Sequence, residues 1–365
     1  VAHSMGGLIG RCLLQKVIPD HVRVGGTAEQ AADVVDKFFT YATPHGGIEF
    51  AVGLGLLERL RDTFGIAGAD IFGPQRMWQY LTPVGGPRKA TKGWRPQEMP
   101  DGAFPKDRIF TLVGTNPGDY DVAMGLSSRA VGVKSDGLVQ IENAAIPGAR
   151  SAYVHRSHSG RYGIVNSEEG YQNLRRFLFG NLNVRTELVG LDLSAGRRGD
   201  LVWQAEAELA VRGLPVLMHE QVAAHHCPIQ LEPTDHTVQL AATGLFMDPL
   251  ARPDDAARSR LTLRVRVLAL AERRGIFDFT HHLEHGAEFD DQLVVDVGAL
   301  DGRPAVWAVW GSQIRVLTRD YEPSGPPLRD EDPTVGTWSA TMPLPPSATA
   351  LLGADAAIRI TARPN

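Results

Sequence analysis

The chain begins with the stretch Val1-Ala2-His3-Ser4-Met5-Gly6-Gly7. It has the pattern small-x-Ser-x-Gly, and an apolar helical run follows it. A serine in this pattern lies on a sharp turn between a strand and a helix, where the residues two positions before and after it come close together. Ala2 and Gly6 are small enough for such a turn. The stretch therefore predicts that Ser4 is presented at the start of a helix.

Ser4 has two interpretations at this stage. As a nucleophile it would attack a carbonyl, and the amide of Met5 at the helix start would face the negative charge that develops. As an ordinary N-cap its hydroxyl would bond to amides of its own helix, and the glycines would allow close packing. The motif alone does not separate the two, so the rest of the chain has to decide.

Length and composition restrict the class of protein. A chain of 365 residues is longer than one typical domain, and two domains are expected. A hydrophobic content of 43% with 22% charged residues is typical of a soluble globular protein. The net charge of −5, with scattered Lys and Arg, argues against a nucleic-acid partner or a basic membrane surface. No apolar run has the length of a membrane span.

The two cysteines, Cys12 and Cys227, lie in different halves of the chain. They provide no disulfide framework, which favours a reducing compartment such as the cytoplasm.

The start of the sequence is unusual for this kind of turn. The first residue is Val1, and only Val1 and Ala2 remain of the strand that must precede Ser4. We therefore expect the sequence to be a fragment of a longer protein. A signal peptide would lie upstream, so its absence does not indicate a compartment.

The first half alternates between expected strands and helices. Helices are expected over 6–18 and 167–179. Strands are expected over 37–42, 108–115 and 149–154, the second being almost continuously apolar, as in a parallel sheet buried on both faces. Between the first two strands, residues 48–105 form a long insertion with expected helices near 54–64 and 77–81. Such an insertion is typical of a cap over a binding site, or else consists of packing helices and a loop.

After residue 180 the periodicity changes to two. Leu261, Leu263, Val265 and Val267 alternate with polar residues, and the same alternation occurs over 293–297 and 358–361. Turn-forming clusters separate these segments. The second half therefore predicts an antiparallel β-sandwich-like domain over 181–365.

Two further polar residues follow expected strands in the first half. Asp136 lies in the segment 134–139 after the strand at 108–115, and His158 follows the strand at 149–154. The chain order Ser4, Asp136, His158 is the order of the nucleophile, acid and base in the α/β-hydrolase fold.

Three motifs in this order resemble the lipase/esterase branch of the α/β-hydrolases, closest to the bacterial lipase-like and GPI-inositol-deacylase-like groups. They are Ala-His-Ser-Met-Gly-Gly at 2–7, Tyr-Ala-Thr-Pro-His-Gly-Gly at 41–47 and Ser-Asp-Gly-Leu-Val at 135–139. The resemblance covers about 1–179. It implies that 1–180 is the C-terminal part of an α/β-hydrolase domain, a partial parallel sheet with the helical cap insertion at 48–105.

The chemistry of this family assigns a role to each residue. Ser4 would be the nucleophile, His158 the base that takes its proton, and Asp136 the carboxylate that orients the imidazole. His155 is the alternative base, and Asp136 could instead be part of a simple Asp-Gly turn. The amide of Met5 would supply half of the oxyanion hole. The other half in this family precedes the nucleophile turn, so the fragment is expected to lack it and to have little activity alone.

His3 and His45 are both expected near the same site and among its substrate-binding residues. His3 would be a packing or substrate-facing residue, and His45 would help to shape the pocket. The histidine clusters at 225–227 and 281–285 match no zinc spacing, and no glycine-rich phosphate loop is present, so neither a metal nor a cofactor is expected. The first hypothesis is therefore a serine esterase or lipase for hydrophobic acyl esters, with acyl transfer left open. The second is a non-catalytic binding or scaffold protein built on a hydrolase-like platform. The sequence gives no indication of the oligomeric state.

Overall fold

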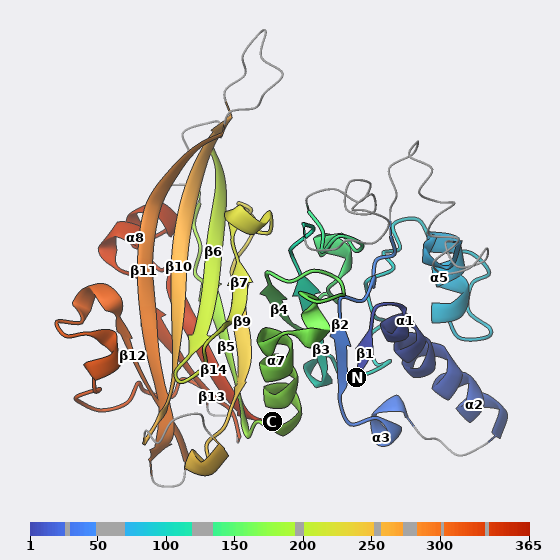
Figure 1. Ribbon diagram of the computed structural model, residues 1–365, viewed down its shortest axis with the longest axis horizontal. Coiled ribbons are helices and arrows are strands. Elements are labelled where there is room, and N and C mark those ends of the chain that lie inside the picture. Colours follow the sequence, from blue (N-terminus) through green and yellow to red (C-terminus); the bar gives the residue numbers. More distant parts are fainter. Residues whose placement is uncertain are drawn as a thin grey trace. The chain divides into compact units, whose positions relative to one another are not determined.

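The computed structural model describes residues 1–25, 30–48, 70–118, 134–193, 201–251, 257–272, 283–300, 303–332 and 336–365 (Figure 1). The chain divides into two compact units, an N-terminal unit over Val1–Leu174 and a C-terminal unit over Arg175–Asn365. The division falls inside helix α7 (Glu168–Phe179), a few residues before the boundary expected at 180.

A four-stranded parallel sheet forms the N-terminal unit, with the strand order β1-β2-β3-β4. Its strands are β1 (Ala2–His3), β2 (Phe38–Tyr41), β3 (Ile109–Gly114) and β4 (Arg150–Val154). All four run in the same direction, so their carboxyl ends lie at one edge of the sheet. The turns that follow them can therefore contribute to one site.

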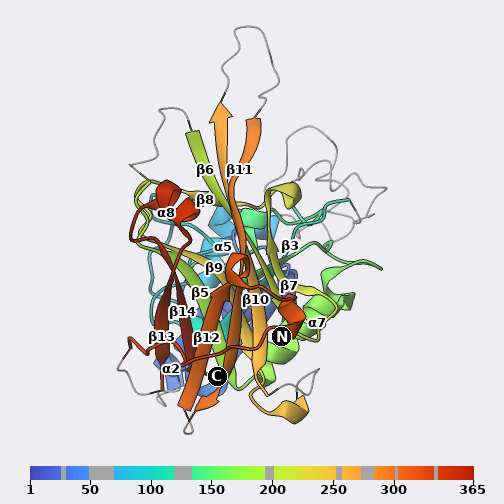
Figure 2. The same cartoon turned by 90° about the vertical axis from the view of Figure 1, so that its left-hand side faces the viewer.

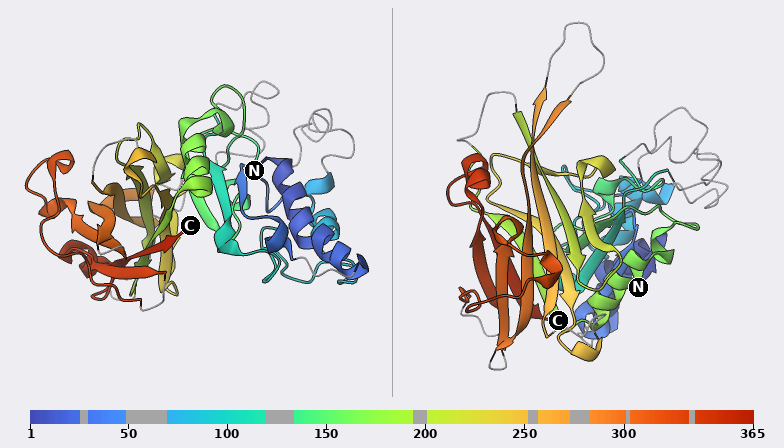
Figure 3. Two further views of the ribbon diagram at one scale, coloured as in Figure 1. Left: turned by 90° about the horizontal axis from the view of Figure 1, so that it is seen from below. Right: turned by 60° about the vertical axis from the view of Figure 1, so that its left-hand side comes forward.

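Helices cover both faces of this sheet (Figure 3). A Cβ atom added to Gly10 of α1 (Met5–Cys12) would lie 2.6 Å from the ring of Phe38, so α1 packs on that face. Tyr41 donates a hydrogen bond of 3.0 Å to the carbonyl of Gly170 in α7. Phe38 and Tyr41 point to opposite faces, because side chains alternate along a strand. Every residue of β2 and β3 is buried, as expected for a sheet between helical layers.

The other helices described in this unit are short. After α1, a π-helical segment (Leu13–Val17) leads into α2 (Ile18–Gly25), so the helix runs beyond the expected end at 18. α3 (Ala31–Val34) precedes β2, and α5 (Pro74–Leu81) is the second helix expected in the insertion. The first, near 54–64, lies outside the described residues. No helix in the described ranges is long and apolar enough to cross a bilayer.

The C-terminal unit contains two antiparallel sheets (Figure 2). The larger has the order β12-β11-β10-β6-β7, and β8 pairs with β6. Its strands are β6 (Leu201–Val211), β7 (Leu217–Gln221), β8 (Ile229–Leu231), β10 (Ser259–Glu272), β11 (Leu283–Leu300) and β12 (Arg303–Trp310). The smaller has the order β13-β14-β5-β9. Its strands are β5 (Leu182–Val189), β9 (Thr237–Leu245), β13 (Trp338–Pro343) and β14 (Ala357–Pro364).

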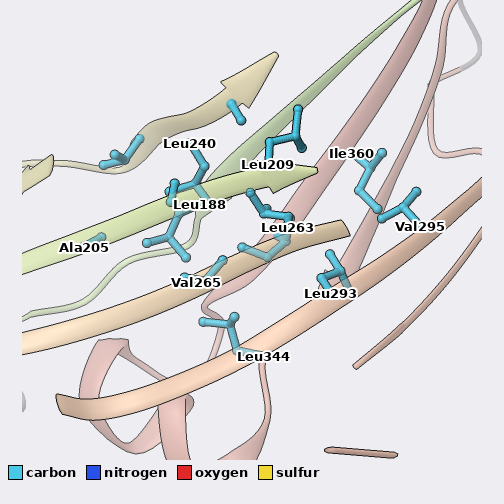
Figure 4. Packing of buried hydrophobic residues seen from close by; sticks show 14 of the residues in the cluster. Leu188, Ala205, Leu209, Leu240, Leu263, Val265, Leu293, Val295, Leu344 and Ile360 are labelled. Atoms are coloured by element: carbon cyan, nitrogen blue, oxygen red, sulfur yellow. The ribbon is translucent and has the colours of Figure 1, made fainter. Parts of the chain in front are cut away.

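One apolar core joins the two sheets. Leu263 and Leu293 come from the larger sheet and Leu188 and Ile360 from the smaller, and all four belong to one buried cluster (Figure 4). Helix α8 (Pro346–Leu352) closes the cluster with two of its own residues. The residues alternating over 261–267 are buried on β10 and pair antiparallel with β11, which confirms the expected antiparallel second half.

Strand β7 carries a buried histidine. His219 is almost fully buried, and burial lowers its pKa to about 4, opposed by a side-chain hydrogen bond with Gln221. In an unfolded chain the pKa of histidine is about 6.5. Below that pH the unfolded state binds a proton at His219 that the folded state excludes. The contribution of neutral His219 to the free energy of unfolding is therefore fully present above pH 6.5 and is lost as the pH falls toward 4.

We predict that His219→Gln reduces the pH dependence of stability. From these two pKa values, the natural protein loses about 2 kcal/mol between pH 7 and pH 5 at this position, and the variant does not. Urea unfolding at the two pH values measures the difference. The matched control is His236→Gln, because His236 is exposed on the surface. Equal losses in all three proteins would contradict the prediction.

Candidate active site

Ser4 occupies a strained turn directly after β1. Its backbone angles are φ 54° and ψ −132°, in a region that costs energy for any residue with a side chain. The Ser4 amide donates 2.9 Å to the carbonyl of Tyr41, and α1 begins at the next residue, Met5. The Ser4 hydroxyl makes no capping bond to α1. The ordinary N-cap interpretation therefore does not describe this serine.

Two contacts on the Ser4 carbonyl hold the turn in place. The carbonyl accepts from the Gly7 amide at 3.0 Å and from Thr43 Oγ1 at 2.9 Å. Thr43 is fully buried after β2, next to Ala42, whose φ of 46° is also positive. A Cβ on Gly7 would lie 2.1 Å from Thr43 Oγ1, so only glycine leaves room for the threonine.

Asp136 is buried at the carboxyl end of β3. Its Oδ1 accepts from the amides of Leu138 at 3.0 Å and Val139 at 2.8 Å, which fixes the carboxylate within its own loop. The last residue of β3 is Gly114, where a Cβ would lie 2.9 Å from the Cβ of Asp136. The absence of a side chain at Gly114 therefore makes the space in which Asp136 lies.

His158 connects the carboxylate with the serine. Its backbone amide donates 2.8 Å to the Asp136 carbonyl, and its Nδ1 lies 2.9 Å from Asp136 Oδ2. Its Nε2 lies 3.0 Å from Ser4 Oγ. A carboxylate only accepts hydrogen bonds, so Nδ1 carries the ring proton and Nε2 is left to accept from the Ser4 hydroxyl. The structure thus brings the three residues named from the sequence into one chain of hydrogen bonds.

His155, the alternative base, takes no part in this arrangement. It is exposed, and its Nδ1 lies 3.4 Å from Thr115 Oγ1. His158 is therefore the histidine in contact with Ser4.

The two histidines expected near the site differ in where they lie: His3 lies against His158, whereas His45 lies in the interior. His3 is half-buried, and its Nε2 lies 2.9 Å from the backbone carbonyl of His158, so its ring contacts His158. His45 is fully buried, with Nε2 at 3.1 Å from Thr40 Oγ1. Burial, together with the nearby charge of Arg11, lowers the pKa of His45 well below its ordinary value. This burial corrects the expectation that His45 is a substrate-binding residue.

Arg11 holds the turn that contains His45 by a hydrogen bond. This fully buried residue of α1 donates 3.1 Å to the His45 carbonyl, 2.7 Å to the Pro96 carbonyl and 3.0 Å to the Glu98 carbonyl. Its Nε bonds to Gln15 at 2.7 Å. Burial lowers the pKa of Arg11 to about 10, so the group remains charged at neutral pH. Helix α1 is thereby hydrogen-bonded to two loops, one containing His45 and the other containing Pro96 and Glu98.

Sequence reasoning missed three residues that shape the site: Thr43, Gly7 and Gly114. Thr43 lies in the Thr-Pro-His-Gly-Gly motif, but the motif does not reveal which oxygen its hydroxyl contacts 39 residues away. The glycines stand next to a turn and at the end of a strand, where glycine is common for many reasons. Only the neighbouring side chains give them a specific role.

Comparisons with known proteins assign no family to the chain. No protein-family model, curated protein or solved structure matches it. The chemistry of the site therefore has to be inferred from its own geometry.

We predict that Gly7→Ala destabilises the serine turn. The new methyl group would overlap Thr43, and overpacking of a buried site costs about 1–3 kcal/mol. The matched control is Gly6→Ala, whose Cβ would lie 3.7 Å from that of Ala2, an ordinary contact. Urea unfolding measures both variants. A Gly7→Ala variant as stable as Gly6→Ala would show that the turn can relax around the methyl group.

Proposed function

We propose that the chain is the serine-bearing part of an α/β-hydrolase that cleaves carboxylic esters. One observation carries the proposal: the hydroxyl of Ser4 on its strained turn, Nε2 of His158 at 3.0 Å, and Asp136 at 2.9 Å from Nδ1. A serine hydroxyl is a weak nucleophile unless a base takes its proton, and this arrangement provides the base and the group that orients it.

The chemistry follows from the direction of these hydrogen bonds. Ser4 Oγ attacks the ester carbonyl while its proton passes to Nε2 of His158, and Asp136 stabilises the imidazolium. The imidazolium then gives the proton to the leaving alcohol, which departs and leaves the acyl group on Ser4. Water attacks the acyl group by the same route in reverse, releasing the acid and restoring Ser4.

The amide of Met5 is the group that would stabilise the tetrahedral intermediate. It is the first amide of α1, and the first amides of a helix have no acceptor within the helix. The positive end of the helix dipole adds to the same effect. The charge that develops on the carbonyl oxygen during attack therefore meets a donor next to the nucleophile.

The substrate class remains the expectation from the sequence. Apolar residues in the 48–105 insertion favour a hydrophobic acyl group, and a second alcohol could replace water as the acyl acceptor. The steps described above involve the ester, the acyl acceptor and the side chains of Ser4, His158 and Asp136.

We predict that a fluorophosphonate labels Ser4 in the natural full-length protein. Ser4→Ala abolishes labelling, and His158→Ala lowers its rate by about 10³-fold or more, because the serine loses its base. The matched control is His155→Ala, which removes an exposed histidine of the same loop that contacts Thr115. This variant is expected to label at the natural rate. Mass spectrometry of the labelled peptide identifies the site.

Two labelling results would contradict the proposal. If the natural protein is not labelled, or if labelling persists in Ser4→Ala, the hydrolase proposal is wrong. A non-catalytic platform would then be the better interpretation.

A further inference from the structure

His3 links the nucleophile strand to the main chain of the base. It is the last residue of β1 and directly precedes Ser4. Its Nε2 lies 2.9 Å from the carbonyl oxygen of His158, 155 residues further along the chain. Because a carbonyl only accepts hydrogen bonds, Nε2 of His3 carries the proton and donates it. When His3 is neutral, its ring proton is therefore on Nε2 and not on Nδ1.

The contact completes a clamp around His158. On one side, the His158 amide and Nδ1 bond to the carbonyl and carboxylate of Asp136. On the other side, the His158 carbonyl bonds to His3. The peptide groups on both sides of the His158 side chain are thus held, one by the Asp136 loop and one by the strand that carries Ser4. Both bonds restrict the position of the imidazole relative to the serine.

The two rings also pack against each other. Their centroids are 4.9 Å apart and their planes are tilted by 42°. Burial lowers the pKa of His3, the nearby His158 lowers it further, and the bond to the His158 carbonyl and the charge of Asp136 act in the opposite direction. A neutral His3 donates its hydrogen bond without repelling the imidazolium that forms on His158 during catalysis.

We infer that His3 is a positioning residue. Its hydrogen bond to the His158 carbonyl keeps the loop that carries His158 against the turn at Ser4, so that Nε2 of His158 stays within hydrogen-bond distance of Ser4 Oγ. This inference rests on the proposed hydrolase function. The sequence predicts a packing or substrate-facing residue at this position, and the inference assigns His3 a positioning role in place of a substrate contact. Positioning of a base is needed in both acylation and deacylation, so its loss lowers kcat, whereas loss of a substrate contact raises KM.

The test uses two variants of His3 in the natural full-length protein. His3→Phe keeps an aromatic ring next to His158 but removes the donor. His3→Gln keeps a donor at the position of Nε2, because the glutamine amide reaches about as far as the histidine ring. Steady-state hydrolysis of a short-chain nitrophenyl ester and the rate of fluorophosphonate labelling are measured for each variant. Thermal unfolding of each variant verifies that it is folded.

We expect His3→Phe to lower kcat about tenfold or more, the effect of one lost hydrogen bond on the position of a catalytic group. KM stays within about twofold of the natural value. His3→Gln restores most of kcat. If His3→Phe does not fold, His3→Leu, which also has no donor, is measured in its place.

Two results would overturn the inference while leaving the hydrolase proposal intact. One is a natural protein that is labelled on Ser4 together with a His3→Phe variant of unchanged kcat. The other is a rise in KM at constant kcat, which assigns His3 to the substrate. A natural protein that is not labelled at all refutes the proposed function itself, so the two failures are distinguishable.

Discussion

The backbone conformation of Ser4 is the constraint on which the site depends. A φ of 54° is unfavourable for a serine, so the surrounding structure has to hold it. Tyr41 accepts from the Ser4 amide, while Gly7 and Thr43 donate to its carbonyl. These contacts come from β2, from the residue Thr43 shortly after it, and from α1, the helix that begins after Ser4. The strain therefore persists only because the parallel sheet and its first helix are packed together.

The same sheet brings the partners of Ser4 to one edge. Ser4 follows β1, Asp136 lies over the end of β3, and His158 follows β4. Parallel strands end at a common edge, so residues 154 apart in sequence come within 3.0 Å. Buried amides then fix the carboxylate of Asp136, and the carboxylate fixes the ring of His158. Each group is thus positioned by the one before it: backbone amides hold the Asp136 carboxylate, the carboxylate holds the His158 imidazole, and the imidazole contacts the Ser4 hydroxyl.

Much of the fold could be predicted from periodicity alone. The apolar run at 108–115 became β3, and the alternation over 261–267 became part of β10, because burial on two faces or on one face leaves a different sequence pattern. The start of the helix at 167–179 was predicted from a capping serine and the two carboxylates that follow it, and α7 runs from Glu168 to Phe179. The long insertion was less predictable, because a loop without periodicity carries no such signal.

The sequence by itself determined Ser4 and Asp136 as candidates and narrowed the base to His158 or His155, because these residues follow expected strands in the order that the chemistry requires. The choice between His155 and His158 was decided only by the tertiary structure, because three positions along a loop do not reveal which ring points at the serine. Tertiary structure also decided the place of His45 in the interior and of His3 against His158. Side chains from distant segments make these contacts, and sequence spacing carries no information about their distances.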